Sequence, residues 1–211
     1  MSKRAGLERP LIPPRASLKS LAEAVQECRA CDLWKNATRA VFGEGSRSSA
    51  LMMVGEQPGD KEDLAGKPFV GPAGKLFDKA LDEAGIDRAA VYITNAVKHF
   101  KWEPRGKVRI HKKPNGKEIA ACRPWLDAEI AAIRPRIVVL MGATAAQSML
   151  GSDFRVTQHH GEFLAASTPH PHEVTATVHP SSILRAPDEK ARHREMARFI
   201  EDLRAVAARL K

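Results

Sequence analysis

Four short polar segments carry side chains that could bind a ligand or take part in a reaction. The first, Gly55-Glu56-Gln57-Pro58-Gly59-Asp60, places two carboxylates and an amide in a glycine-containing loop. Glycine lets the backbone approach a flat ligand closely, and Glu56 or Asp60 could orient water or stabilise positive charge. A turn whose acidic side chains are simply solvated is the alternative for this segment taken alone.

The other segments contain Asn95, Gly142-Ala143-Thr144-Ala145 and His179-Pro180-Ser181-Ser182. The Asn95 amide can donate and accept at once, which matches the O4 and N3–H edge of uracil and mismatches cytosine. The His179 imidazole could stabilise charge that builds up on a leaving base. A capping asparagine and a structural histidine are the alternatives here.

Phe69 lies in the rigid Pro/Gly loop of residues 67–74, directly before an apparent helix. In that position its ring could stack on a base, an interaction that contributes about 1–3 kcal/mol per base. An isolated phenylalanine is otherwise expected in the core.

Three cysteines, Cys28, Cys31 and Cys122, cannot all pair with one another. A disulfide framework is unexpected in a reducing compartment, so metal or cluster ligation is the leading interpretation. Cys28-x-x-Cys31 offers two soft ligands from one helix end, and Cys122 stands near the start of another helix. A zinc site and an iron-sulfur cluster both suit these ligand types.

The elements that position these segments are buried strands alternating with helices. Continuous apolar runs at 50–54, 90–94, 137–141 and 174–178 predict strands, and helical patterns fall at 73–84, 118–133, 143–150 and from about 188. This alternation predicts a three-layer α/β/α sandwich with a mainly parallel, four-stranded central sheet. Ligands bind outside the carboxyl ends of such strands, where the four polar segments fall.

The chain of 211 residues, 43% of them hydrophobic, is long enough for one core. Residues 1–16 are predicted to form a mobile basic arm and 17–211 a single domain, which begins with a short helix capped by Ser17. A formal charge of +9 favours a phosphate-rich partner. No apolar run predicts a membrane helix or a signal peptide, so a cytoplasmic monomer is expected.

The segments GEQPGDKED, PFVGPAG, TNAVKHF and HPSS resemble the uracil-DNA glycosylase superfamily, in particular its iron-sulfur, family 4-like branch. They occur in that family's order and spacing over about residues 20–205. The stretch Gly106-Lys107-Val108-Arg109-Ile110-His111 is similar to the extra loop of the UdgX subfamily, usually KRRIH, with Val108 in place of an arginine.

The resemblance implies a role for each matching residue. Glu56 and Gln57 would belong to the catalytic loop, together with Asp60, and Phe69 would stack on uracil. Asn95 and Gln57 would bind the base, His179 would lie near uracil O2, and His111 would capture the sugar covalently. The resemblance also implies a 4Fe-4S cluster held by Cys28, Cys31, His99 and Cys122, where His99 takes the place of a cysteine. The residues expected to contact DNA are Lys98, Lys107, Arg109, Ser181, Ser182, Leu184 and Arg185, with Leu184 filling the gap that a flipped base leaves.

The expected function is therefore excision of uracil from DNA, including single-stranded DNA, with covalent capture of the abasic sugar. A neutral imidazole held over C1′ would outcompete water by proximity. Two alternatives remain open: an ordinary turnover glycosylase, and a non-enzymatic iron-sulfur protein that binds DNA.

Overall fold

The computed structural model describes residue 10, residues 12–166 and residues 172–211. Its centre is a five-stranded sheet with the strand order β2-β1-β5-β7-β6. The strands are β1 (Leu51–Gly55), β2 (Val91–Asn95), β5 (Ile137–Met141), β7 (Glu173–Thr177) and β6 (Phe163–Ala165). The first four run parallel to their neighbours, whereas β6 pairs antiparallel with β7. The four predicted strands agree to within one residue, and β6 is an additional edge strand.

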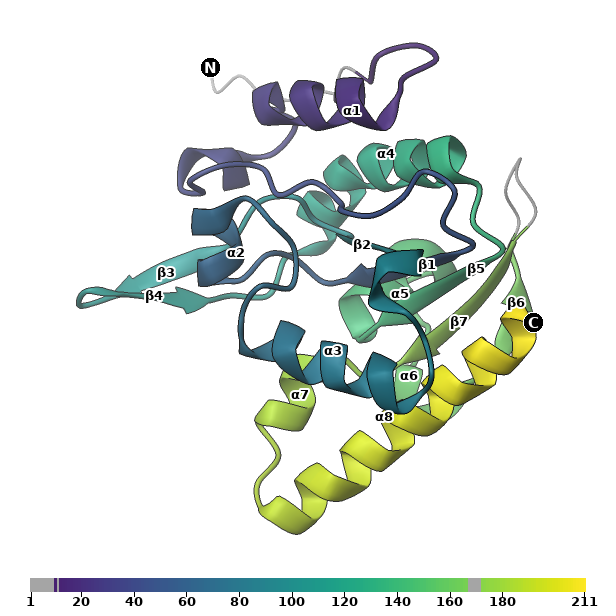
Figure 1. Ribbon diagram of the computed structural model, residues 1–211. Helices are drawn as coiled ribbons and strands as arrows, with labels where there is room; N and C mark the ends of the chain where they lie inside the picture. Colours follow the sequence, from purple (N-terminus) through teal and green to yellow (C-terminus); the bar gives the residue numbers. More distant parts are fainter. Residues whose placement is uncertain (1–9, 11, 167–171) are drawn as a thin grey trace.

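Helices cover both faces of this sheet (Figure 1). Alternate residues of the strands, such as Met53 and Ile93, pack with Phe77 of α3 (Pro72–Glu83) and Phe199 of α8 (Glu189–Leu210). The intervening residues pack against α4 (Gly116–Ile133) and α5 (Ala143–Leu150). Every position of β1, β2 and β5 is buried because both faces are covered, which explains their continuous apolar sequence. The three-layer α/β/α prediction is confirmed.

The helices that the sequence predicts are all present. They are α1 (Leu18–Ala24), α3 (Pro72–Glu83), α4 (Gly116–Ile133), α5 (Ala143–Leu150) and α8 (Glu189–Leu210). Ser17 caps α1 by accepting a hydrogen bond from the Ser20 backbone N–H at 3.1 Å, as expected. The described part of the chain also contains three shorter α-helices that were not predicted: α2 (Asp60–Ala65), α6 (Val156–His159) and α7 (Pro180–Leu184).

A two-stranded hairpin projects from the body of the molecule (Figure 1). It consists of β3 (Trp102–Arg105) and β4 (Val108–His111), which pair antiparallel. Most of its residues are exposed, so it lacks the apolar alternation that would have identified it in the sequence.

The N-terminal segment packs on α4 through a third apolar cluster. Leu21 and Val25 of this segment meet Trp125 of α4 there. Most of the predicted mobile arm lies outside the described residues, but Ile12 and Ala16 pack against this cluster. Among the described helices, none combines the length and the apolar character that crossing a membrane requires.

Candidate functional site

The carboxyl ends of four parallel strands bring the predicted polar segments together. Glu56 and Gln57 follow β1, Asn95 ends β2, Gly142 follows β5, and His179 comes two residues after β7. Three of them, Gln57, Asn95 and His179, line a cavity of about 180 Å³ together with Phe69, His111 and Arg185. This volume is below the roughly 300–1,000 Å³ of drug-sized pockets, so the cavity suits a small ring. A larger groove of about 620 Å³ adjoins the cavity. The two share several lining residues, among them Gln57 and His111, and Glu56 lines the groove.

Asn95 offers its amide to this cavity. The residue is 2% exposed, and among the described residues its amide has no hydrogen-bond partner. Gly55 lies beside it on β1, where an added Cβ would come within 2.4 Å of Asn95 Oδ1 and 2.8 Å of the Phe69 ring. Glycine at this position therefore lets the amide and the ring approach one another across the cavity.

Phe69 is held in a strained backbone conformation with φ of +57°. A left-handed conformation costs a residue with a side chain roughly 1–3 kcal/mol. Gly74 makes the arrangement possible, since a Cβ there would lie 1.6 Å from the Phe69 carbonyl oxygen. The Phe69 ring lies 5.3 Å from the Phe77 ring and 5.9 Å from His179, between centroids. The loop thus fixes an aromatic wall of the cavity.

Gln57 connects the loop after β1 to the hairpin. Its Oε1 accepts a hydrogen bond from the Lys101 N–H at 3.1 Å, while Nε2 lies 3.2 Å from the Lys101 carbonyl and 3.0 Å from that of Lys112. Nε2 is also 2.9 Å from His111 Nε2. These contacts orient the amide and place His111 beside the loop that carries Glu56.

His111 ends β4, and its imidazole is half-exposed at the cavity wall. Burial lowers its pKa below 6.5 and the Arg185 charge acts in the same direction, outweighing the opposing effect of Glu56. The ring is therefore neutral at pH 7. When Nε2 accepts the Gln57 hydrogen bond, the proton resides on Nδ1 and the Nε2 lone pair points toward the Gln57 amide. Nε2 also lies 3.4 Å from Glu56 Oε1.

His179 is held as a neutral hydrogen-bond donor. Burial lowers its pKa to about 4, assisted by the charges of Arg185 and His111. Its Nδ1 accepts from the Ser181 backbone N–H at 3.1 Å and lies 2.8 Å from Ser181 Oγ. Since Nδ1 is an acceptor, the neutral ring carries its proton on Nε2.

Arg109 tethers the hairpin to α2. Its guanidinium contacts Asp60 Oδ1 at 2.5 Å and the buried Asp63 Oδ2 at 2.6 Å. Burial opposes the charge, but the hydrogen bonds to Asp63 and Asp60 outweigh it and raise the Arg109 pKa. Asp60 thus anchors Arg109 in this structure. The catalytic role of Asp60 and the DNA contact of Arg109 stay predictions. Val108, where the similar loop usually carries arginine, is 60% exposed and takes no part in this tether.

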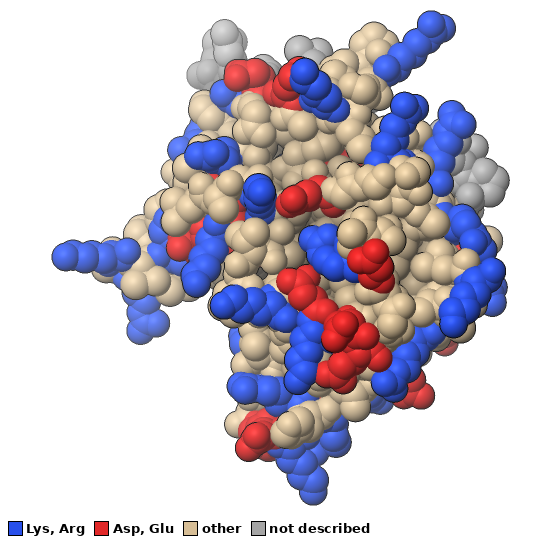
Figure 2. All heavy atoms as spheres, in the orientation of Figure 1, with Lys and Arg blue, Asp and Glu red and all other residues tan. Residues whose placement is uncertain are grey.

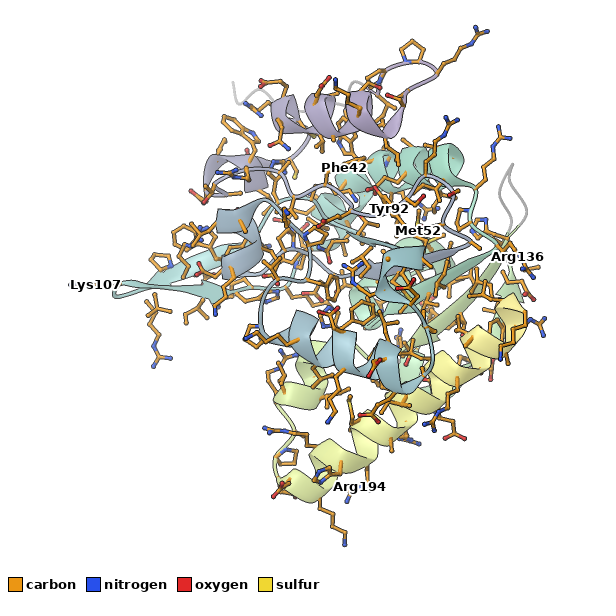
Figure 3. The ribbon with its side chains drawn as sticks, viewed as in Figure 1. Phe42, Met52, Tyr92, Lys107, Arg136 and Arg194 are labelled. Carbon is orange, nitrogen blue, oxygen red and sulfur yellow. The ribbon has the colours of Figure 1, made fainter. Side chains whose placement is uncertain are left out.

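The prediction that Lys98 contacts DNA is wrong. Lys98 is completely buried and forms an ion pair with Glu129 at 2.5 Å. By contrast, Lys107 is exposed at the hairpin tip, far from the molecular centre (Figure 3). Basic side chains project along this hairpin, whereas acidic ones gather in the middle of the same face (Figure 2).

The other predicted DNA contacts surround the cavity mouth. Ser181, Ser182 and Arg185 line the larger groove, and Leu184 ends α7. The sequence interpretation missed Thr144, whose hydroxyl contacts Glu56, and Glu62, which lines the small cavity. Both lie in polar segments that had been recognised, but nothing local distinguished these residues from their neighbours.

Cys28 and Cys31 of the N-terminal segment lie near Cys122 of α4. Burial raises the pKa of Cys122 to about 12, with nearby Lys98 opposing and the Cys31 and Cys28 thiols adding to the rise. Sulfur atoms accept hydrogen bonds here, since the Trp125 indole N–H lies 3.2 Å from Cys28 Sγ and the Lys98 N–H lies 3.2 Å from Cys122 Sγ.

His99 is 5% exposed and has no hydrogen-bond partner among the described residues. Burial lowers its pKa to about 4, helped by Arg29, so its ring is neutral. Within the described part of the chain, no three His, Cys, Asp or Glu side chains are grouped so that they could hold a metal ion.

Comparison with known proteins places these features in a family context. Residues 42–204 match the family model described as the uracil DNA glycosylase superfamily. A type-4 uracil-DNA glycosylase of Pyrobaculum aerophilum is 35% identical, with 81% of this chain and 86% of that protein aligned. A type-4 uracil-DNA glycosylase of Thermotoga maritima is 38% identical over 80% of this chain and 83% of its own. The type-4 uracil-DNA glycosylase of Saccharolobus solfataricus is 42% identical, with 60% of this chain and 56% of that protein aligned.

Proposed function

Because this chain belongs to the uracil-DNA glycosylase superfamily, we propose that it excises uracil from DNA and captures the abasic sugar through His111. The family match and the type-4 relatives support cleavage of the N-glycosidic bond of uracil in DNA. The covalent step rests on one observation. The Nε2 atom of a neutral imidazole lies at the wall of the small cavity, 3.4 Å from the Glu56 carboxylate.

Uracil recognition is assigned to three side chains of the cavity. Phe69 stacks on the ring, and the Asn95 amide, unpartnered among the described residues, pairs with O4 and N3–H. Thymine carries a 5-methyl group that the narrow cavity has little room for, and cytosine presents a donor where Asn95 needs an acceptor. His179 donates its Nε2–H toward uracil O2.

Bond cleavage follows from the charges that these groups stabilise. The C1′–N1 bond breaks, its electron pair goes to uracil, and the neutral His179 stabilises the resulting anion by hydrogen bonding at O2. The sugar becomes an oxocarbenium-like cation, which the Glu56 carboxylate stabilises. The His111 Nε2 lone pair, released from its hydrogen bond to the Gln57 amide, then attacks C1′, forming an N–C bond and leaving an imidazolium charge beside Glu56.

DNA is expected to reach the cavity along the larger groove. Lys107, Arg185, Ser181 and Ser182 would contact phosphates, and Leu184 would occupy the space of the flipped nucleotide. Arg109 and Asp60 support this surface indirectly by holding the hairpin. Binding of single-stranded DNA and action as a monomer remain predictions.

A 4Fe-4S cluster held by Cys28, Cys31, Cys122 and His99 is the second part of the proposal. The chemistry of the side chains supports it: the three thiols interact electrostatically with one another, two sulfur atoms accept N–H donors, and the neutral His99 ring is unpartnered among the described residues. The cluster would supply a cross-link between the N-terminal segment, α4 and the segment after β2. Purified protein should be brown and contain iron and sulfide, whereas stoichiometric zinc without iron would contradict this part.

One experiment separates the candidate functions. Protein is incubated with a uracil-containing oligonucleotide, with a thymine-containing oligonucleotide as the control substrate, and products are analysed on denaturing gels and by mass spectrometry. We expect a denaturation-resistant adduct on His111. Free uracil and a bare abasic strand would favour the turnover glycosylase, and binding without cleavage would favour a non-enzymatic DNA-binding protein.

The His111→Ser variant sharpens this assay. It should lose the adduct while the uracil pocket remains, so water can attack the exposed sugar cation and uracil is released. His159→Ser is the matched control, because His159 lies on α6 and pairs with Glu162 at 3.0 Å, away from the cavity lining. An adduct formed by His111→Ser at the wild-type rate would refute the assignment.

A further inference from the structure

The Glu56 carboxylate accepts a hydrogen bond from a side chain that lies outside the substrate cavity. Thr144 donates its hydroxyl hydrogen to Glu56 Oε2 at an Oγ1–Oε2 distance of 2.5 Å. The other oxygen, Oε1, is left facing His111 Nε2 at 3.4 Å. The two carboxylate oxygens therefore have different surroundings, one fixed by the protein interior and the other directed to the reacting groups.

Thr144 is well suited to hold this carboxylate in place. It is completely buried and lies in the first turn of α5, which starts directly after β5. Strands β5 and β1 are hydrogen-bonded neighbours, so the hydroxyl and the carboxylate come from adjacent strand ends. Threonine has a restricted χ1 angle, and its position on a helix packed against the sheet leaves the hydroxyl little freedom.

The approach of α5 to this site depends on the residue before the helix. Gly142 has φ of +86°, and an added Cβ would lie 2.9 Å from the Cβ of His179. Its N–H donates to the Thr177 carbonyl at 2.8 Å, which connects the start of α5 to β7. The Gly142-Ala143-Thr144 segment thus packs against the histidine loop on one side and reaches Glu56 on the other.

From these contacts we propose that Thr144 is a positioning residue for the reaction at this site, an inference that rests on the proposed uracil-excision function. Thr144 does not touch the substrate, because it is buried and absent from the lining of both the cavity and the groove. It keeps Glu56 Oε1 directed toward His111 and the sugar. Without the hydroxyl, the carboxylate can rotate and lose its alignment with the developing positive charge.

The test compares Thr144→Val, which removes the hydroxyl at nearly constant shape, with Thr144→Ser, which retains it. Single-turnover uracil release and adduct formation are measured alongside oligonucleotide affinity. We expect Thr144→Val to slow the chemical step about 10- to 100-fold, in line with losing one hydrogen bond to a charged group. Affinity should stay within about twofold, and Thr144→Ser should restore most of the rate.

Thr175→Val is the matched control. Thr175 is a buried threonine of β7 whose Oγ1 has no hydrogen-bond partner within the described ranges, so removing its hydroxyl should leave the rate unchanged. Thr144→Ala provides a second loss of the hydroxyl without a new methyl group, and circular dichroism confirms which variants are folded. Slowing in a folded Thr144→Ala variant with normal affinity would support the positioning role.

A double-mutant cycle with Glu56→Ala shows whether Thr144 acts through Glu56. If it does, Thr144→Val should change the residual rate of the Glu56→Ala variant by less than about threefold. An equal loss in both backgrounds, or no rescue by serine, would overturn the positioning role. An active wild type with an unchanged Thr144→Val variant would overturn this inference alone, whereas a wild type that leaves uracil-containing DNA intact would overturn the proposed function as well.

Discussion

Replacing Lys98 by methionine removes one partner of a buried ion pair and leaves the other in place. The Lys98 ammonium donates to Glu129 Oε2 at 2.5 Å, Thr94 Oγ1 at 2.6 Å and the Asn95 carbonyl at 2.8 Å, so all three N–H donors are used. Both charged side chains are 0% exposed. Methionine has a similar length, so the substitution mainly removes charge and hydrogen bonds.

The size of the effect follows from what remains around Glu129. Removing one member of a buried pair typically costs about 3–5 kcal/mol, because an uncompensated charge stays buried. Glu129 keeps donors from the Tyr92 hydroxyl at 2.9 Å and the Gly43 N–H at 3.1 Å, which favours the lower end. A loss of about 3 kcal/mol corresponds to a melting temperature lowered by roughly 6–12 °C for a chain of this size.

The assay is urea unfolding of the intact protein, followed by circular dichroism and tryptophan fluorescence. Lys79→Met is the control, since the Lys79–Glu83 pair spans 3.6 Å with side chains 70% and 43% exposed. It should change the unfolding free energy by about 0.5 kcal/mol or less. Adding Glu129→Gln to Lys98→Met should recover stability, because no buried charge then remains. Equal stability of the two single methionine variants would refute the reasoning.

Three further predictions concern the reaction and the cluster. Because burial lowers the pKa of His111 and only the neutral ring attacks, adduct formation should fall as the pH drops, with its midpoint below pH 6.5. A midpoint above 6.5 in gel assays would contradict this. Asn95→Asp should slow uracil release at least about tenfold at pH 7, since a carboxylate replaces the donor to O4, and an unchanged single-turnover rate would exclude Asn95 as the reader. His99→Ala should lower the iron content while far-ultraviolet circular dichroism remains native, and full iron occupancy would show that His99 is not a ligand.

Structural features that depend on short stretches of sequence, such as strands and loops, were predictable. The buried strands are continuous apolar runs, and a parallel sheet brings its strand ends to one edge, so residue pattern alone places Asn95 and His179 together. The loop that precedes α3 was likewise recognisable from its prolines and glycines. The backbone conformation of Phe69 in this loop was not predictable, because its positive φ depends on the close approach of the Phe69 carbonyl to Gly74.

The roles of the charged residues were decided only by tertiary structure. The local sequence around a lysine does not show whether its side chain faces solvent or a buried acid. Lys98 pairs with Glu129, a buried glutamate 31 positions away. Arg109 likewise pairs with Asp60 and Asp63 because the hairpin lies beside α2. By itself, the sequence determined the strands, the loops and the family resemblance, since these depend on local residue pattern. The ion pairs and the hydroxyl that binds Glu56 depend on burial and on contacts between distant segments. The local residue pattern carries no information about burial or about those contacts.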